Sequence, residues 1–189
     1  MVTATRTGAR RLVTGGDPDA RFVVPVEGDF TDLVDETVAH DYIPAPEVRE
    51  VGEALIDACP EFAHLRGVEI AYLWRREGGK TKGRLTLGKC TKPSGLLAHF
   101  SGATWVVWLA ADHIGVRSFT AWQVEALVYH ELCHTSVAGE DDTPTLVGHD
   151  VEAFRAELAR YGLWKPDLEG LKGPVQLALR MDAYGDEVR

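Results

Sequence analysis

The chain has few cysteines, no long apolar run and no excess of cations, and each shortage excludes a class of protein. Its three cysteines, Cys59, Cys90 and Cys133, are odd in number and unevenly spaced, so we expect reduced thiols and no disulfide framework. The longest apolar run, 105–111, falls far short of the roughly 18 residues of a membrane span, so we expect no membrane partner. A formal net charge of −9 makes nucleic acid an unexpected partner.

The size and composition of the chain are those of one globular domain with flanking segments. The chain has 189 residues, of which 45% are hydrophobic and 26% charged, enough to bury a core. We predict a disordered or loosely attached segment over 1–20, a folded domain over 21–165 and a C-terminal extension over 166–189. The cations that come nearest to a patch flank the glycine-rich turn at 78–83, where we expect a solvated hairpin tip.

A helix is predicted over 120–136. Thr120 and Gln123 have the spacing of a capping box, and Glu125 places negative charge near the positive end of the helix dipole. Apolar residues recur with helical spacing after this point, and neither proline nor glycine occurs before Gly139.

This helix carries the sequence His130-Glu131-Leu132-Cys133-His134. Histidines four residues apart lie on one helix face, about one turn apart, where two imidazoles can hold one metal ion. Glu131 is rotated by roughly 100° from His130, so its carboxylate can reach a water bound to that ion and accept its proton. The pattern therefore predicts a zinc hydrolase with Glu131 as the general base.

A third ligand is expected further along the chain, because catalytic zinc usually takes three protein ligands and keeps one position open. A turn or loop is predicted over 139–144, and Gly148-His149-Asp150 then opens a second amphipathic helix that Gly162 ends. We favour His149 as the third ligand and keep Glu152 as the alternative. Asp150 or Glu152 would then orient a ligand imidazole from outside the coordination sphere.

The residues around the motif resemble a known family. The run 122–134, followed by Gly148-His149-Asp150 and then by Tyr161-Gly-Leu-Trp164, resembles the putative phage metallopeptidase family, and Gly88-Lys89 belongs to the matching upstream part. The resemblance covers most of 45–165. In its His-Glu-x-x-His element and its later Gly-His element, this zincin-like group is also similar to the SprT-like proteases, although the chain has no paired-cysteine zinc ribbon after the motif helix.

The resemblance implies a zinc-dependent metallopeptidase with one Zn²⁺ per chain. It implies His130, His134 and His149 as the metal ligands and Glu131 as the catalytic base. We expect a peptide or protein as the substrate, and the resemblance does not imply which one. No apolar segment follows Arg6, Arg10 and Arg11, so we expect no secretory signal and a cytoplasmic protein, in the host cytoplasm if the chain is phage-encoded.

The remaining pattern predicts an α+β fold. A helix is predicted over 47–59, and strands over 67–74, 84–90 and 104–110. We expect the strand at 84–90 to pair with that at 67–74 across the glycine-rich turn, giving a small three-stranded, zincin-like sheet packed with helices. If the strand at 104–110 lies at the sheet edge beside the metal, it can pair with an extended substrate.

Other polar residues near the motif have alternative roles. Cys133 is expected to pack in the core, and Cys90 is a less favoured extra metal ligand. The residues whose chemistry suits an oxyanion stabiliser are Tyr129, Tyr161, His99 and His113, and the sequence does not choose among them.

Two other functions compete with the peptidase. One is a catalytically silent, zinc-stabilised binding or regulatory protein, which would have a closed site with four protein ligands. The other is a metal hydrolase that acts on a non-peptide amide.

Overall fold

The computed structural model describes residues 11–149 except 33, 34, 36–38, 82, 140 and 142. Arg11–Val147 form one compact unit; a second unit comprises Met1–Arg10 and Gly148–Arg189, of which Gly148 and His149 are described. After His149, the helix predicted to end at Gly162, with Asp150, Glu152 and Tyr161, therefore lies outside the described residues, as do the extension over 166–189 and half of the segment 1–20. No described helix is long and apolar enough to cross a membrane.

The described chain is a mixed α+β fold with four α-helices, two short 3-10 helices and eight strands. In chain order the elements are η1 (Glu27–Phe30), β1 (Tyr42–Pro44), α1 (Pro46–Ala58), η2 (Pro60–Leu65), β2 (Ile70–Arg75), β3 (Lys80–Thr81), β4 (Arg84–Leu85), β5 (Gly88–Thr91), α2 (Gly95–Ser101), β6 (Trp105–Ala110), α3 (Ala111–Arg117), α4 (Ala121–Leu132), β7 (Thr135–Ala138) and β8 (Thr143–Leu146).

The main sheet has four strands in the order β1-β2-β6-β5. β2 and β6 are parallel, whereas β1 and β5 pair antiparallel with their neighbours. The predicted pairing of 84–90 with 67–74 was wrong, because β6 lies between β2 and β5. The glycine-rich turn instead closes the two-residue strands β3 and β4 on each other.

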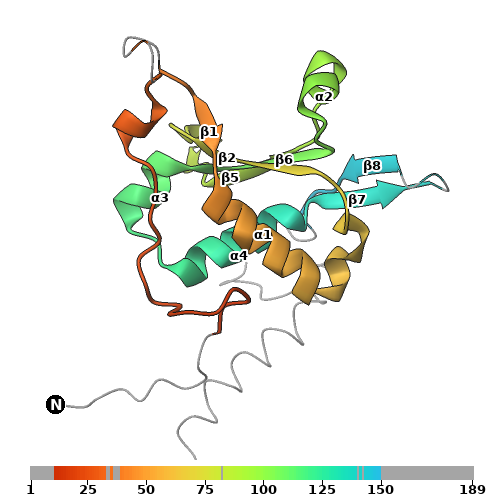
Figure 1. The fold of residues 1–189 in the computed structure, drawn as a ribbon, viewed down its shortest axis with the longest axis horizontal. Coiled ribbons are helices and arrows are strands. Elements are labelled where there is room, and N and C mark those ends of the chain that lie inside the picture. Colours follow the sequence, from red (N-terminus) through yellow and green to blue (C-terminus); the bar gives the residue numbers. More distant parts are fainter. Residues whose placement is uncertain are drawn as a thin grey trace, which may run out of the picture. The chain divides into compact units, whose positions relative to one another are not determined.

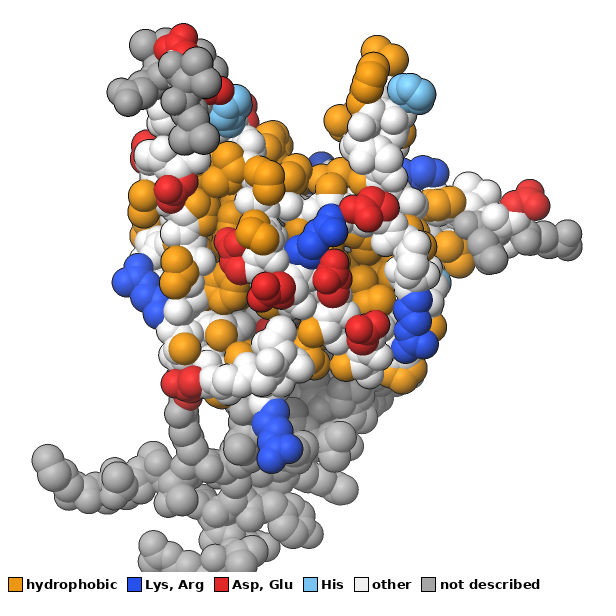
Figure 2. Space-filling view, viewed as in Figure 1, with side chains coloured by type: hydrophobic (Ala, Val, Ile, Leu, Met, Phe, Trp, Pro, Cys, Tyr) orange, Lys and Arg blue, Asp and Glu red, His pale blue; other side chains and the backbone are white. Residues whose placement is uncertain are grey.

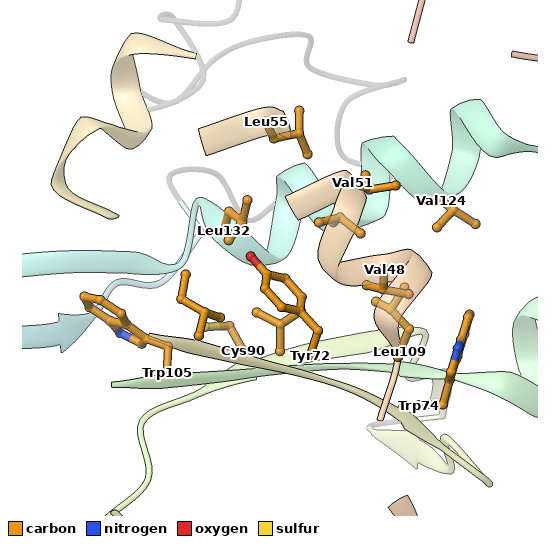
Figure 3. Packing of buried hydrophobic residues seen from close by; sticks show 14 of the residues in the cluster. Val48, Val51, Leu55, Tyr72, Trp74, Cys90, Trp105, Leu109, Val124 and Leu132 are labelled. Atoms are coloured by element: carbon orange, nitrogen blue, oxygen red, sulfur yellow. The ribbon is translucent and has the colours of Figure 1, made fainter. Parts of the chain in front are cut away.

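Helices cover one face of this sheet. Figure 1 shows α1 and α4 on one side of the strands, with α2 rising on the other side. In Figure 3 the side chains of Tyr72, Cys90 and Leu109 stand on the strands and face the two helices. The core between these layers is formed by buried side chains that include Val48, Val51, Leu55, Tyr72, Trp74, Cys90, Trp105, Val107, Leu109, Val124, Val128 and Leu132.

Helix α1 confirms the helix predicted over 47–59. Pro46 begins it, where a missing N–H costs nothing, and the buried Val48, Val51 and Leu55 have the expected helical spacing. The indole N–H of Trp74 donates to the Glu47 carboxylate in the first turn.

The start of α4 confirms the predicted capping box. Thr120 Oγ accepts from the Gln123 N–H at 3.4 Å, and the Gln123 side chain accepts from the Thr120 N–H at 2.9 Å. The next two N–H groups, of Ala121 and Trp122, donate to backbone carbonyls at 20 and 18. The orphan donors at this helix end are therefore satisfied, partly by a segment a hundred residues away in the chain.

The end of α4 differs from the prediction, since the helix stops at Leu132 and not at 136. The Thr135 hydroxyl donates to the Leu132 carbonyl at 2.6 Å, and β7 then begins. β7 pairs with β8, with Val137 opposite Pro144, so a hairpin occupies residues for which helix and loop were predicted. Residues near the predicted helix end form a strand because tertiary pairing outweighs local propensity.

Candidate metal and catalytic site

His130 and His134 come from the last turn of α4 and the turn that follows. His130 is inside the helix, and His134 lies two residues beyond its end. Their ring centroids are 5.1 Å apart and the rings are nearly perpendicular, at 88°. His130 is exposed and His134 is half-buried, so the pair faces solvent on one side.

The backbone at the base of the β7–β8 hairpin orients His134. The His134 Nδ1 lies 2.8 Å from the Val147 carbonyl oxygen, and the Val147 N–H donates to the His134 carbonyl at 2.9 Å. A carbonyl can only accept, so Nδ1 carries the proton and the lone pair for coordination is on Nε2.

His149 follows Val147 by two residues, and its nitrogen joins this pair. The ligand nitrogens of His130, His134 and His149 all lie within 4.8 Å of one another. Donors about 2.1 Å from one zinc ion lie roughly 3.4 Å apart in a tetrahedral set, so the three nitrogens are near enough to share an ion after a small inward movement of their side chains. Nothing in the described residues tests the alternative ligand Glu152.

Glu131 is buried, although the motif histidines before and after it, His130 and His134, reach solvent. It is 4% exposed. Burial raises the pKa of its carboxyl to about 7, against the opposing effects of His134, a hydrogen bond from the Cys90 backbone, and Lys89. A desolvated carboxylate held by a backbone N–H has little freedom to rotate away.

That backbone contact places Glu131 against the edge strand β5. β5 pairs only with β6 among the described strands. The Ala110 N–H donates to the Leu87 carbonyl, so odd-numbered residues of this segment point their backbone groups at β6, and those of Gly88 and Cys90 point to the open side. The prediction that the strand at 104–110 is the edge was wrong, because β6 is paired on both sides.

Gly88 makes the close approach of this edge to the carboxylate possible. A Cβ at Gly88 would lie 3.0 Å from Glu131 Oε1, 2.9 Å from Leu109 Cδ2 and 3.2 Å from the Trp108 carbonyl oxygen. An isolated glycine within a strand pattern is a sign of such an approach. That sign was present in the sequence, but it did not say which residue approaches.

The cysteines lie outside the three-histidine group. Cys133 is exposed, so the prediction that it packs in the core was wrong. Its position at the cap of a shortened helix turns it outward. Cys90 is buried in the core, and burial raises the pKa of its thiol to about 12, which keeps it protonated.

The described candidates for an oxyanion stabiliser each have other contacts. The Tyr129 hydroxyl donates to Glu61 at 2.6 Å, and this bond raises the pKa of Tyr129. His113 is in α3, where Nδ1 lies 3.0 Å from the Thr86 carbonyl oxygen. His99 is on the exposed helix α2, where its ring meets the Phe100 ring edge-on with 5.2 Å between the centroids.

The family model described as putative phage metallopeptidase matches residues 40–172, well over half of the chain. The chain belongs to this family. Searches of curated proteins and of solved structures gave no significant match. The similarity to SprT-like proteases stays a prediction.

Membership in a metallopeptidase family implies a metal, and the donors at this site fit one. Imidazole nitrogens suit zinc, and three of them leave a position of its tetrahedral set for water.

Proposed function

We propose that this metallopeptidase family member is a zinc-dependent peptidase, with one ion held by His130, His134 and His149 and with Glu131 as the general base. The observation that carries the proposal is the position of Glu131. Its buried carboxylate adjoins the histidine group in the chain and contacts, in space, the edge of β5 that no described strand pairs with. Water, metal and peptide can therefore meet at one carboxylate.

When bound, zinc lowers the pKa of its water ligand and polarises the scissile carbonyl. Glu131 accepts the proton of that water and passes it to the leaving amine. The Cys90 N–H holds the carboxylate in place, and the Val147 carbonyl holds His134 in the tautomer that coordinates through Nε2.

The edge strand β5 is where we place the substrate. The backbone groups of Gly88 and the Cys90 carbonyl face away from β6, so an extended peptide can pair with them beside Glu131, while the Cys90 N–H stays with the carboxylate. Main-chain pairing would hold the scissile bond at a fixed height over the ion, with little dependence on sequence.

A matched pair of substitutions on α4 tests the base. Glu131→Gln and Glu125→Gln each remove a buried carboxylate from the same helix, and Glu125 contacts the Val13 N–H rather than the histidine group. We expect Glu131→Gln to keep its zinc and lower hydrolysis of a labelled unfolded protein by at least about 10²-fold. Glu125→Gln should retain activity. A fully active Glu131→Gln variant would show that the mechanism is wrong.

Elemental analysis tests the ligands. The wild type should hold one zinc per chain, the His149→Ala variant should lose it, and Glu152→Ala should keep it. Loss of zinc in the Glu152→Ala variant alone would identify Glu152, and not His149, as the third ligand.

The same samples separate the competing functions. Zinc at full occupancy without hydrolysis of any peptide would favour the silent binding protein. Hydrolysis of cell-wall amides but not of unfolded protein would favour the non-peptide amide hydrolase.

A further inference from the structure

Helix α2 exposes an apolar surface that the fold does not use. Leu96, Leu97 and Phe100 are 76%, 62% and 80% exposed, and no residue of α2 is buried. Figure 1 shows the helix standing away from the sheet on the face opposite α1 and α4. Figure 2 shows orange side chains gathered at its tip. Three large apolar side chains on seven residues indicate an interaction surface.

The chain around α2 is cationic and contains no acid. Residues 78–111 hold five of the 20 Lys and Arg and none of the 29 Asp and Glu. Three of the five fall within 80–84, which holds β3 and β4, and the two nearest to α2 in the chain are Lys89 and Lys92. Lys89 and Lys92, which precede the helix, are exposed, and the Lys92 ammonium donates to the Pro144 carbonyl at 2.6 Å. In a chain with a net charge of −9, this segregation favours a ligand with negative charge beside its apolar groups.

The surface continues the edge strand β5. Three residues, Lys92 to Ser94, separate the end of β5 from the start of α2. A polypeptide paired with Gly88 and the Cys90 carbonyl and extending past Thr91 would therefore meet Lys92 and then the apolar tip of α2.

We propose that α2 and Lys92 form a substrate exosite, which captures apolar segments flanked by acidic residues in extended polypeptides. The proposal rests on the proposed function in one respect, the placing of substrate along β5. The apolar tip binds the aliphatic and aromatic side chains of a segment outside the cleaved bond, and Lys92 attracts its carboxylates.

Two other occupants fit less well. A seven-residue helix cannot bury the roughly 800 Å² per partner of a stable dimer. An anionic membrane would attract the cations but repel a chain with a net charge of −9.

A binding assay tests the exosite separately from catalysis. The probe is a fluorescent 16-residue peptide of alternating Leu/Phe and Glu, with a matched peptide in which Lys replaces Glu, titrated with the zinc-loaded Glu131→Gln chain. In this background, Leu96→Ser, Leu97→Ser and Phe100→Ser together should weaken binding of the acidic peptide by at least about tenfold, since burial of even one such side chain is worth that factor. Lys92→Gln should reduce the preference for the acidic peptide.

The control is a pair of substitutions at exposed valines elsewhere, Val23→Ser and Val116→Ser, at 82% and 85% exposure. These should leave binding unchanged. Denaturant unfolding should show equal stability for the triple variant and the control, because all five side chains are exposed.

Kinetics with the catalytic chain complete the test. The triple variant should raise KM for an unfolded protein about tenfold, keep kcat, and leave unchanged the cleavage of a peptide too short to reach α2. Unchanged peptide affinity in the triple variant would overturn the exosite. The exosite would also be overturned if vesicle binding or dimerisation depended on α2 and peptide binding did not. Peptide binding through α2 by a chain that hydrolyses nothing would support the exosite and refute the proposed function.

Discussion

Substitution of Gly88 by alanine should displace the carboxylate of Glu131, the proposed base, and destabilise the sheet edge, and the two effects can be measured separately. The new methyl group would lie 3.0 Å from Glu131 Oε1, where ordinary contacts begin at 3.4 Å, so the carboxylate must retreat by a few tenths of an ångström. A misplacement of about 1 Å costs on the order of 10² in rate, so this retreat predicts a loss of about three- to tenfold in kcat/KM.

The same methyl group also meets Leu109 Cδ2 at 2.9 Å and the Trp108 carbonyl oxygen at 3.2 Å. Crowding of this kind in a packed region typically costs about 1–3 kcal/mol of unfolding free energy. The assay compares kcat/KM on an unfolded protein, zinc content and denaturant unfolding for Gly88→Ala with those for Gly28→Ala, where no heavy atom lies within 4 Å of the added Cβ. Gly28→Ala should match the wild type. Lower stability with full activity in Gly88→Ala would refute the link between β5 and the base.

Three further predictions concern buried groups and the metal. Burial raises the pKa of Glu125 above its ordinary 4.5, so deprotonation of this carboxyl opposes folding. The wild type should therefore lose stability relative to Glu125→Gln as the pH rises from about 4.5 through the raised pKa. If urea titrations gave the same difference in stability between the two proteins at every pH, the prediction would be contradicted. The buried Tyr72 hydroxyl has no hydrogen-bond partner among the described residues, so Tyr72→Phe should raise the unfolding free energy by up to about 1–3 kcal/mol in chemical denaturation, and a loss would indicate a missed partner. Chelation should lower the melting temperature of the wild type but not that of His149→Ala, and an equal drop in both would place the metal elsewhere.

Local signals predicted the parts of the fold that local interactions form. Pro46 and the spacing of Val48, Val51 and Leu55 sufficed for α1, because a helix closes its own hydrogen bonds. The capping box at Thr120 likewise located the start of α4. The end of α4 was not predictable in this way, since β7 exists through pairing with β8.

The sheet order depends on contacts between distant residues, and no local pattern in the chain indicates it. The glycine-rich turn joins β3 to β4, and the parallel pairing of β2 with β6 leaves 88–91 at the edge of the main sheet. At the site, the spacing of His130, Glu131 and His134 was enough to predict these residues from the sequence. The contact of Glu131 with Gly88 and Cys90 was not, because it follows from the sheet order.

The arrangement of the central strands also bears on how the chain folds. β5 and β6 are joined by the short connection that contains α2, whereas all the residues from Arg76 to Thr104 separate β2 from β6. Closure of the shorter loop costs less entropy, so we expect the β5–β6 hairpin to form first and the parallel pairing to limit the folding rate. Until β2 docks, the β5–β6 hairpin has two open edges, and the newly made chain is most exposed to aggregation at that stage.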